Sequence, residues 1–230
     1  MSFKFITVDE VIDIMKKYKY KTFHIHHTWK PTHKSFTGTN HIQLQTSMRN
    51  HHVNVNGWSD IGQHLTLFPD GKLLTGRDFS KPPASISGFN TGALAIEMVG
   101  NFDKPGTGEY NNLGYDRLEG EQKKVILKLV QAFGEMFGYD NIIFHRDKSP
   151  KTCPGTSIDK DFFIAEAKNY KEIGTIKVKV RGDVKEIEGF IKDGTSYFVV
   201  DKMIVSVRST LETLGLIVGW DNKDKIITID

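Results

Sequence analysis

Short apolar segments alternate with long amphipathic segments along most of this chain, and this alternation is the strongest constraint on its fold. The runs ALAIEMV, at 93–99, and NIIFH, at 141–145, have the length and apolar character of buried strands. Between them, residues 116–137 repeat apolar side chains at helical spacing, and helices are also predicted at 39–54 and 159–170. The pattern predicts an α/β domain whose central mixed sheet is flanked by helices.

Two further strand-forming regions precede this core. Residues 22–28, TFHIHHT, predict a strand of mixed polarity. Residues 61–76, IGQHLTLFPDGKLLTG, predict a hairpin, because two short apolar runs flank the turn-forming sequence Pro69-Asp70-Gly71. Both fit the same α/β domain.

The pattern changes near Ile173-Gly174, where long helices give way to short strands. We predict one domain at 1–172 and a small α+β module at 175–230, with a helix at about 202–214. The module has nine Lys and Arg residues and nine Asp and Glu residues, so the net charge of +3 belongs to the first domain. Such a mild charge would assist binding to an anionic polymer, a bacterial wall or a nucleic acid, but it identifies neither.

Composition excludes several classes of protein. No apolar run approaches the roughly 18 residues that cross a bilayer. The N-terminal MSFKFITVDEVIDIMKK has acidic residues inside its apolar stretch and no small-residue cleavage site, so it does not resemble a Sec signal, and synthesis in the cytoplasm is expected. The single cysteine, Cys153, excludes an internal disulfide framework and leaves three roles: buried filler, metal ligand or nucleophile.

The segment HRDKSPKTC, at 145–153, concentrates reactive side chains. It fits half of a metal site with His145 and Cys153 as ligands, or the active loop of a cysteine hydrolase. It also fits a basic surface loop with an incidental thiol. His145 ends a predicted strand, and α/β sheets place functional groups at the carboxyl ends of their strands.

The histidines of the first predicted strand offer the missing ligands. His24 and His26 share one face of that strand and His27 lies on the other, because successive side chains alternate. A lone histidine at such a place is more often a satisfied polar residue at a sheet edge. Two histidines and one thiolate from separate segments would instead leave a fourth tetrahedral position open, which is the layout of a catalytic zinc site.

Two charged residues stand out beside these candidates. Glu97 interrupts an apolar strand, where a buried carboxylate is costly unless it is paired. It is either a structural partner for a cation such as Arg77 or a general base. Lys151, two residues before Cys153, is either a solvated loop lysine or a stabiliser of a developing oxyanion.

Four segments, FHIHHTW, GQHLTLFPDGKLLTGRD, NTGALAIEMVGNFD and HRDKSPKTCPG, occur in this order within residues 20–170. In sequence and order they resemble the zinc N-acetylmuramoyl-L-alanine amidases. These type-2 amidases include phage endolysins, bacterial autolysins and, more distantly, peptidoglycan recognition proteins. The final His-x5-Lys-x-Cys-Pro spacing makes the resemblance specific.

The resemblance implies a set of site residues. It assigns zinc binding to His26, His145 and Cys153, and catalytic roles to Glu97 and Lys151. Two positions depart from the pattern. Gln63 stands where some members carry a catalytic tyrosine, which favours a mechanism based on the glutamate. His24 is an additional histidine on the face of His26, so the metal-binding member of the cluster is left open.

The resemblance also implies the activity. The protein is expected to be a peptidoglycan hydrolase that cleaves the amide between N-acetylmuramic acid and L-alanine with zinc-activated water. A phage endolysin is favoured, released from the host cytoplasm to act on the cell wall, and a bacterial autolysin is the alternative. Bacterial peptidoglycan is the expected partner, without nucleic acid binding or membrane insertion. The loops at 29–39 and 80–92 would line the substrate groove. Trp29, Trp58 and Phe89 are candidates for packing against the substrate, and each fits a place in the core or at the rim equally well.

Two different functions remain as competitors. One is a cysteine amidase or peptidase in which Cys153 is the nucleophile and His145 the base. The other is a binding module that keeps the fold and has lost catalysis, against which the presence of Cys153 and Glu97 argues.

The C-terminal sequence TIKVKV to KIITID carries a second resemblance. It is similar to the copper amine oxidase N-terminal-like module of many surface proteins, in its glycine-rich turn, a Leu-Gly helix end and Val-x-Trp-Asp. No copper ligands are evident, so no oxidase chemistry is implied. The expected role is cell-wall targeting or formation of a homo-oligomer.

Overall fold

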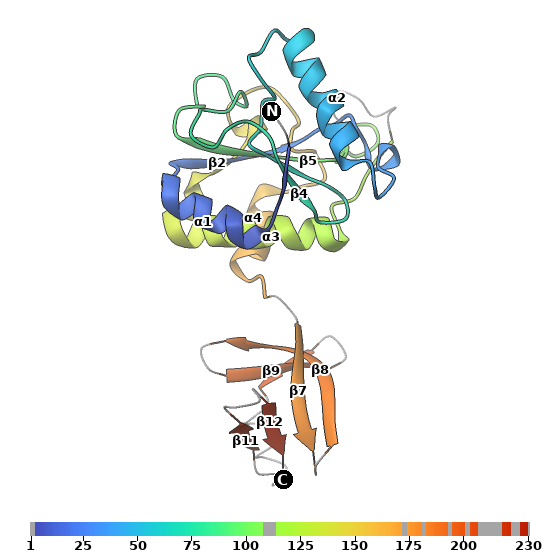
Figure 1. The fold of residues 1–230 in the computed structure, drawn as a ribbon, viewed down its shortest axis with the longest axis vertical. Coiled ribbons are helices and arrows are strands. Elements are labelled where there is room, and N and C mark those ends of the chain that lie inside the picture. Colours follow the sequence, from blue (N-terminus) through green and yellow to red (C-terminus); the bar gives the residue numbers. More distant parts are fainter. Residues whose placement is uncertain are drawn as a thin grey trace. The chain divides into compact units, whose positions relative to one another are not determined.

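A mixed six-stranded sheet organises the N-terminal part of the chain (Figure 1). The strand order is β1-β4-β3-β5-β2-β6. The bounds are β1 Phe5–Ile6, β2 Thr22–His27, β3 Leu65–Leu67, β4 Leu73–Thr75, β5 Ala93–Met98 and β6 Ile142–Phe144. Strands β3, β5, β2 and β6 pair in parallel, whereas β4 pairs antiparallel with β1 and β3. The predicted mixed sheet is therefore confirmed, including the hairpin around Pro69-Asp70-Gly71.

The structure is a computed structural model that describes 3–107, 114–171, 174–180, 183–192, 195–200, 203–206, 218–221 and 226–229. The chain divides into two compact units, Met1–Tyr170 and Lys171–Asp230. None of the described helices has the length and apolar character that crossing a bilayer requires.

Four α-helices flank the first sheet: α1 Val8–Tyr18, α2 His41–Asn54, α3 Gly120–Phe137 and α4 Lys160–Lys168. In Figure 1, α1, α3 and α4 cover one face of the sheet and α2 lies over the other. The helices predicted at 39–54, 116–137 and 159–170 are present, although α3 begins only at Gly120. Gly138 ends α3, as its sequence position suggested.

Helix α1 was not expected from the sequence, although its start carries a clear signal. Thr7 Oγ1 accepts a hydrogen bond from the Glu10 backbone N–H at 3.2 Å, and the Thr7 N–H donates to Glu10 Oε2 at 2.7 Å. This reciprocal capping box satisfies two amide groups at the helix start. Val11 and Met15 of the helix are fully buried against the core.

Alternation along the parallel strands separates an apolar face from a polar face. Phe23 and Ile25 of β2 and Ile96 of β5 belong to the core beneath α1 and α3. Their neighbours His24, His26 and Glu97 therefore point to the opposite face. Each buried large apolar side chain contributes on the order of 2 kcal/mol to the stability of the fold. Burial of the apolar side chains therefore determines which side chains point to the opposite, polar face.

The second unit contains its own six-stranded sheet, of order β10-β9-β8-β7-β12-β11. The bounds are β7 Gly174–Val180, β8 Asp183–Lys192, β9 Thr195–Val200, β10 Met203–Ser206, β11 Val218–Asp221 and β12 Ile226–Ile229. The helix predicted at about 202–214 is wrong over Met203–Ser206, because this β-branched stretch pairs with β9. The rest of that predicted helix, 207–214, lies outside the described residues.

Gly134 in α3 provides a test of the packing between α3 and the 3-10 turn Tyr139–Asn141 that leads to β6. A Cβ at Gly134 would lie 2.3 Å from Tyr139 Cε1. Helix propensity alone predicts that Gly134→Ala stabilises the fold by about 1 kcal/mol. We expect instead a loss of roughly 1–3 kcal/mol in urea unfolding, as for other overpacked sites. In a Tyr139→Ala background the same substitution is expected to stabilise, and destabilisation there would contradict this explanation.

Candidate metal centre

Three candidate ligands converge where parallel strands end. Ile25 of β2 pairs with Phe144 of β6, so the next residues, His26 and His145, emerge at the same edge of the sheet. The loop after β6 returns Cys153 to this edge. Ligand atoms of His26, His145 and Cys153 all lie within 4.8 Å of one another. The structure therefore brings together the three residues selected from the sequence.

The spacing of these atoms suits zinc. His26 Nδ1 lies 3.5 Å from Cys153 Sγ. Two ligands of a tetrahedral zinc ion, at about 2.05 Å for nitrogen and about 2.3 Å for sulfur, would be about 3.6 Å apart. His26 Nε2 is buried and has no hydrogen-bond partner among the described residues. No hydrogen bond from this nitrogen therefore turns the imidazole away from Cys153. Two imidazoles and one thiolate form a zinc-type donor set that leaves a fourth position open.

The environment of the thiol favours a ligand over a nucleophile. Burial raises the pKa of the Cys153 thiol above its ordinary value, and the nearby carboxylates of Glu97 and Asp103 raise it further. Catalytic cysteines require the opposite, a lowered thiol pKa. The backbone N–H of His27 donates to Sγ at 3.4 Å and lowers the thiol pKa, but this effect is smaller than the increase caused by burial. A bound metal ion would displace the thiol proton.

His24 lies outside the three-residue cluster, although it shares a face with His26. Its Nδ1 is 2.8 Å from Ser85 Oγ and its Nε2 is 3.1 Å from Thr22 Oγ1. Both ring nitrogens are thus engaged by hydroxyl groups. Burial lowers the pKa of His24 to about 4, with His145 adding to the effect, so the ring is neutral near pH 7.

Glu97 lies beside the cluster on the same face of the sheet. In the register of β2, β5 and β3 it is paired with His26 on one side and Thr66 on the other. Burial raises the pKa of Glu97 to about 8. Arg77, the structural partner considered from the sequence, donates instead to the backbone carbonyls of Asp60, Ile61 and Pro82.

A pocket of about 280 Å³ opens over the cluster. Its walls include both catalytic candidates, Glu97 and Lys151, together with Trp29, Trp58 and Ser85. A second hollow of about 590 Å³, between the loop after β2 and helix α2, shares Glu97 and Trp29 with the first. Glu97 therefore lines both hollows.

Of the aromatic residues expected at the groove, Phe89 is the most exposed, at 46%. The Lys148 ammonium lies 5.0 Å from its ring centroid, within the range of a cation–π contact. Lys148, a second lysine of the segment HRDKSPKTC, is thus placed against an exposed aromatic ring.

Two residues that sequence reasoning missed hold the Cys153 loop. Asp103 Oδ2 accepts from Thr152 Oγ1 and its Oδ1 accepts from the Thr156 N–H, both at 2.9 Å. Arg146 donates from its backbone to the Cys153 carbonyl at 2.9 Å and from Nη1 to the Gly155 carbonyl at 2.8 Å. Their sequence signal is that each is charged and lies inside one of the four quoted segments, Asp103 as the last residue of NTGALAIEMVGNFD and Arg146 as the second residue of HRDKSPKTCPG.

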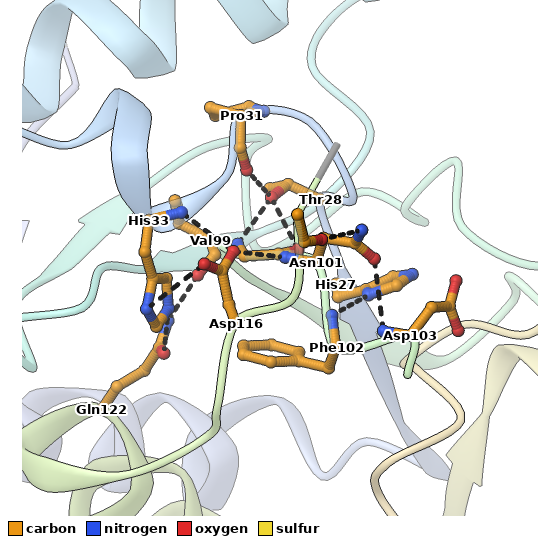
Figure 2. Close-up of polar contacts among 12 residues, drawn as sticks. His27, Thr28, Pro31, His33, Val99, Asn101, Phe102, Asp103, Asp116 and Gln122 are labelled. Atoms are coloured by element: carbon orange, nitrogen blue, oxygen red, sulfur yellow. Dashed lines mark hydrogen bonds and ion pairs between the residues drawn. The ribbon is translucent and has the colours of Figure 1, made fainter. Parts of the chain in front are cut away.

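Asp103 is the end of a buried polar network that Figure 2 shows reaching back to α3. The Asp103 N–H donates to Asn101 Oδ1 at 3.2 Å, and the Asn101 N–H donates to Asp116 Oδ2 at 2.8 Å. Asp116 Oδ2 also accepts from the His33 N–H at 3.0 Å, and His33 Nε2 lies 3.1 Å from Gln122 Oε1. The network fixes irregular backbone on both sides of the pocket.

Comparison with known proteins identifies the family. Residues 16–156 match the N-acetylmuramoyl-L-alanine amidase family. The chain is 25% identical over 104 residues to the endolysin of Enterobacteria phage K11, covering 45% of this chain and 65% of that protein. It is 27% identical over 115 residues to peptidoglycan-recognition protein SC1a of Drosophila melanogaster, covering 49% and 56%. The N-acetylmuramoyl-L-alanine amidase of Mus musculus is 30% identical over 79 residues, covering 34% and 15%.

Solved structures share the fold at lower identity. Bumblebee PGRP-SA superposes with a TM-score of 0.51 at 20% identity, over 74% of this chain and 87% of that chain. The N-acetylmuramoyl-L-alanine amidase LysC from Clostridium intestinale gives a TM-score of 0.50 at 20% identity, over 66% and 88%. The chain spans less than two thirds of the length of the curated relatives above. Because the family match covers more than half of the sequence, the chain belongs to the N-acetylmuramoyl-L-alanine amidase family.

The raised pKa of Glu97 predicts a pH dependence for the metal-free protein. The folded state holds this proton up to about pH 8, whereas an unfolded glutamate loses it near 4.5. The folded state is therefore favoured at low pH, and that advantage is lost as the pH rises from 4.5 through about 8.

We expect EDTA-treated wild type to lose stability relative to Glu97→Gln between pH 5 and pH 9, measured by thermal unfolding. The exposed-site variant Glu135→Gln is the control and should track the wild type. A constant difference between wild type and Glu97→Gln over this range would contradict the assignment.

The contacts of Asp103 predict a role in metal affinity. Asp103→Ala removes both acceptors that hold the Cys153 loop, and it should weaken zinc binding by about 10- to 100-fold, as other residues that support metal ligands do. Competition with a fluorescent chelator would measure this directly. Asp140→Ala, at an exposed carboxylate in the turn before β6, is the matched control. Unchanged zinc affinity in a folded Asp103→Ala protein would refute the role.

Proposed function

We propose that this protein is a zinc-dependent amidase that hydrolyses the bond between N-acetylmuramic acid and L-alanine in peptidoglycan. One observation carries the proposal: the His26, His145 and Cys153 ligand atoms, within 4.8 Å of one another, open onto the pocket that also contains Glu97 and Lys151. Membership of the amidase family supports the choice of bond.

Zinc at this position would polarise the scissile carbonyl and lower the pKa of a water molecule. The protein's own groups then act around it. Beside a zinc cation the carboxylate form of Glu97 would be favoured over the protonated form found in the metal-free protein. Glu97, in register with His26, then takes a proton from the attacking water and returns it to the leaving amine. Lys151 places an ammonium at the pocket wall, where it stabilises negative charge on the carbonyl oxygen.

The environment of Gln63 supports Glu97 as the proton carrier. Gln63 is buried and donates from Nε2 to Thr66 Oγ1 at 2.8 Å. An amide side chain has no titratable proton to offer at the position where some family members carry tyrosine. Glu97 is then the acid–base group of the pocket.

The competing functions are less well supported. A cysteine hydrolase needs a thiolate, and the raised pKa of Cys153 opposes one in the metal-free protein. A binding module without catalysis would not require a glutamate that lines both hollows. Similarity to a phage endolysin favours a lysin that acts on the cell wall after release, over an autolysin of the same chemistry. For the C-terminal unit we propose wall targeting or homo-oligomer formation.

The test combines metal analysis with product analysis. The purified protein should contain one zinc ion per chain, and mass spectrometry of digested muropeptides should show new free L-alanine amines. EDTA should abolish the release, and added zinc should restore it. Lysis that survives excess EDTA but not a thiol alkylator would instead establish the cysteine hydrolase.

Substitution of Glu97 tests the proton carrier. Glu97→Gln should lower turnover by about 10²- to 10⁴-fold, the usual contribution of general acid–base catalysis. Zinc content and binding to cell walls should be retained. Glu135→Gln, at an exposed helix position, is the control. Full activity of Glu97→Gln would remove Glu97 from the mechanism.

A further inference from the structure

Ser85 lies in the pocket wall and belongs to a chain of hydrogen bonds that the proposed hydrolysis does not use. Its Oγ is 2.8 Å from His24 Nδ1 and 3.1 Å from Asn90 Oδ1. On the far side of the imidazole, Thr22 Oγ1 is 3.1 Å from His24 Nε2. The chain thus runs from the start of β2, through a fully buried histidine, to the pocket that contains the candidate ligands.

The direction of these hydrogen bonds is set by Asn90. Its Oδ1 accepts the backbone N–H groups of Ser85 at 3.0 Å and of Ile86 at 2.9 Å, which identifies the atom as the amide oxygen. The Ser85 hydroxyl must therefore donate its proton to Asn90. It follows that Ser85 Oγ accepts from His24, which carries hydrogen on Nδ1, and that Thr22 can donate to Nε2. The reverse direction would leave two oxygens 3.1 Å apart with no hydrogen between them.

These hydrogen bonds leave the Ser85 hydroxyl able to accept one further hydrogen bond. A serine hydroxyl has one proton and two lone pairs. The proton points to Asn90 and one lone pair receives the His24 N–H, so a single lone pair remains. Towards the pocket, Ser85 is therefore a hydrogen-bond acceptor and not a donor.

The loop that carries Ser85 is held along its length. Tyr20 donates its hydroxyl to the Phe79 carbonyl at 2.8 Å, and His64 Nε2 contacts the Lys81 carbonyl at 2.8 Å. The Ala84 N–H donates to the Gly62 carbonyl at 2.9 Å. A wall fixed in this way presents the Ser85 oxygen in one position, as recognition of a single substrate group requires.

We propose that Ser85 is a substrate-recognition residue whose Oγ accepts a hydrogen bond from an amide N–H of the peptidoglycan fragment, with His24 and Asn90 as the positioning residues that keep it an acceptor. The proposal rests on the proposed function. A muramoyl peptide carries such N–H groups on both sides of the bond that is cut, in the acetamido group of the sugar and in the peptide bond after alanine.

The test measures coupling between Ser85 and each substrate N–H. The probe is a soluble N-acetylmuramoyl tripeptide, titrated by calorimetry into zinc-loaded full-length protein carrying Glu97→Gln to prevent turnover. Two analogues replace one N–H by oxygen, either in the acetamido group or in the peptide bond after alanine. Ser85→Ala should weaken binding of the natural probe about 2- to 12-fold, the range for one lost hydrogen bond. The analogue that lacks the N–H bound by Ser85 should bind the protein with Ser85 more weakly than the natural probe does, by the same factor. Ser85→Ala should not weaken the binding of that analogue any further.

The outcomes separate this proposal from the proposed function. Unchanged affinity in Ser85→Ala, or losses that simply multiply for both analogues, overturns the role of Ser85 as an acceptor for an amide N–H. Failure of the Glu97→Gln protein to bind the unmodified tripeptide overturns the proposed function as well. Ser87→Ala, at an exposed position of the same loop, is the matched control and should bind like its parent.

Substitution of His24 distinguishes positioning from metal binding. His24→Leu removes the N–H that Ser85 accepts, and it should weaken the natural probe about as much as Ser85→Ala while zinc content stays at one ion per chain. His24→Gln retains N–H donors and should recover much of the affinity, and it also serves if the leucine variant folds poorly. Loss of zinc from His24→Gln, or wild-type binding by a folded His24→Leu protein, overturns the positioning role.

Discussion

The parallel pairing of β2 with β5 and β6 is the constraint on which the rest of the site depends. Its register sets His26 opposite Glu97 and pairs Ile25 with Phe144, so that the next residues, His26 and His145, lie at the same edge. A slip of one residue would turn His26 into the core and bring Ile25 to the pocket face. The apolar residues Phe23 and Ile25 prevent such a slip because they are fully buried beneath the helices. Core packing and site geometry are therefore set by the same register.

The polar face is ordered by hydrogen bonds where regular structure ends. The Cys153 loop and the segment 101–107 contain no strand or α-helix in the described structure. Asp103 ties the two segments together through Thr152 and Thr156, and Arg146 holds the Cys153 loop from within. Buried polar groups are costly unless they are satisfied, and here each one fixes a piece of irregular backbone. The network in Figure 2 extends this order to α3, on the far side of the sheet.

Local patterns in the sequence predicted the main elements of the first unit. Strands β2, β5 and β6 and helices α2, α3 and α4 follow from the spacing of apolar residues, and the hairpin follows from its turn residues. The shared edge of His26 and His145 could also be anticipated, because parallel strands end together. Helix α1 was missed although Thr7 and Glu10 form a recognisable capping box.

What the sequence could not supply are contacts between segments far apart in the chain. Asp103 ends the quoted segment NTGALAIEMVGNFD, but its role as an acceptor is defined only when Thr152 folds beside it. His24 was a rival ligand from strand alternation alone, and only the approach of Ser85 shows that its nitrogens are engaged elsewhere. The strand Met203–Ser206 was mistaken for helix because its apolar run is short, and short apolar runs fit either structure.

The clamp that Arg146 and Asp103 form around the Cys153 loop has a consequence for the sequence changes that the site can tolerate. Asp103 and Arg146 hold residues on either side of Cys153 through hydrogen bonds of 2.8 and 2.9 Å. A substitution at either residue would move the thiol relative to the two imidazoles, although all three candidate ligands would still be present. A sequence can therefore keep every ligand and still lose the geometry of the site.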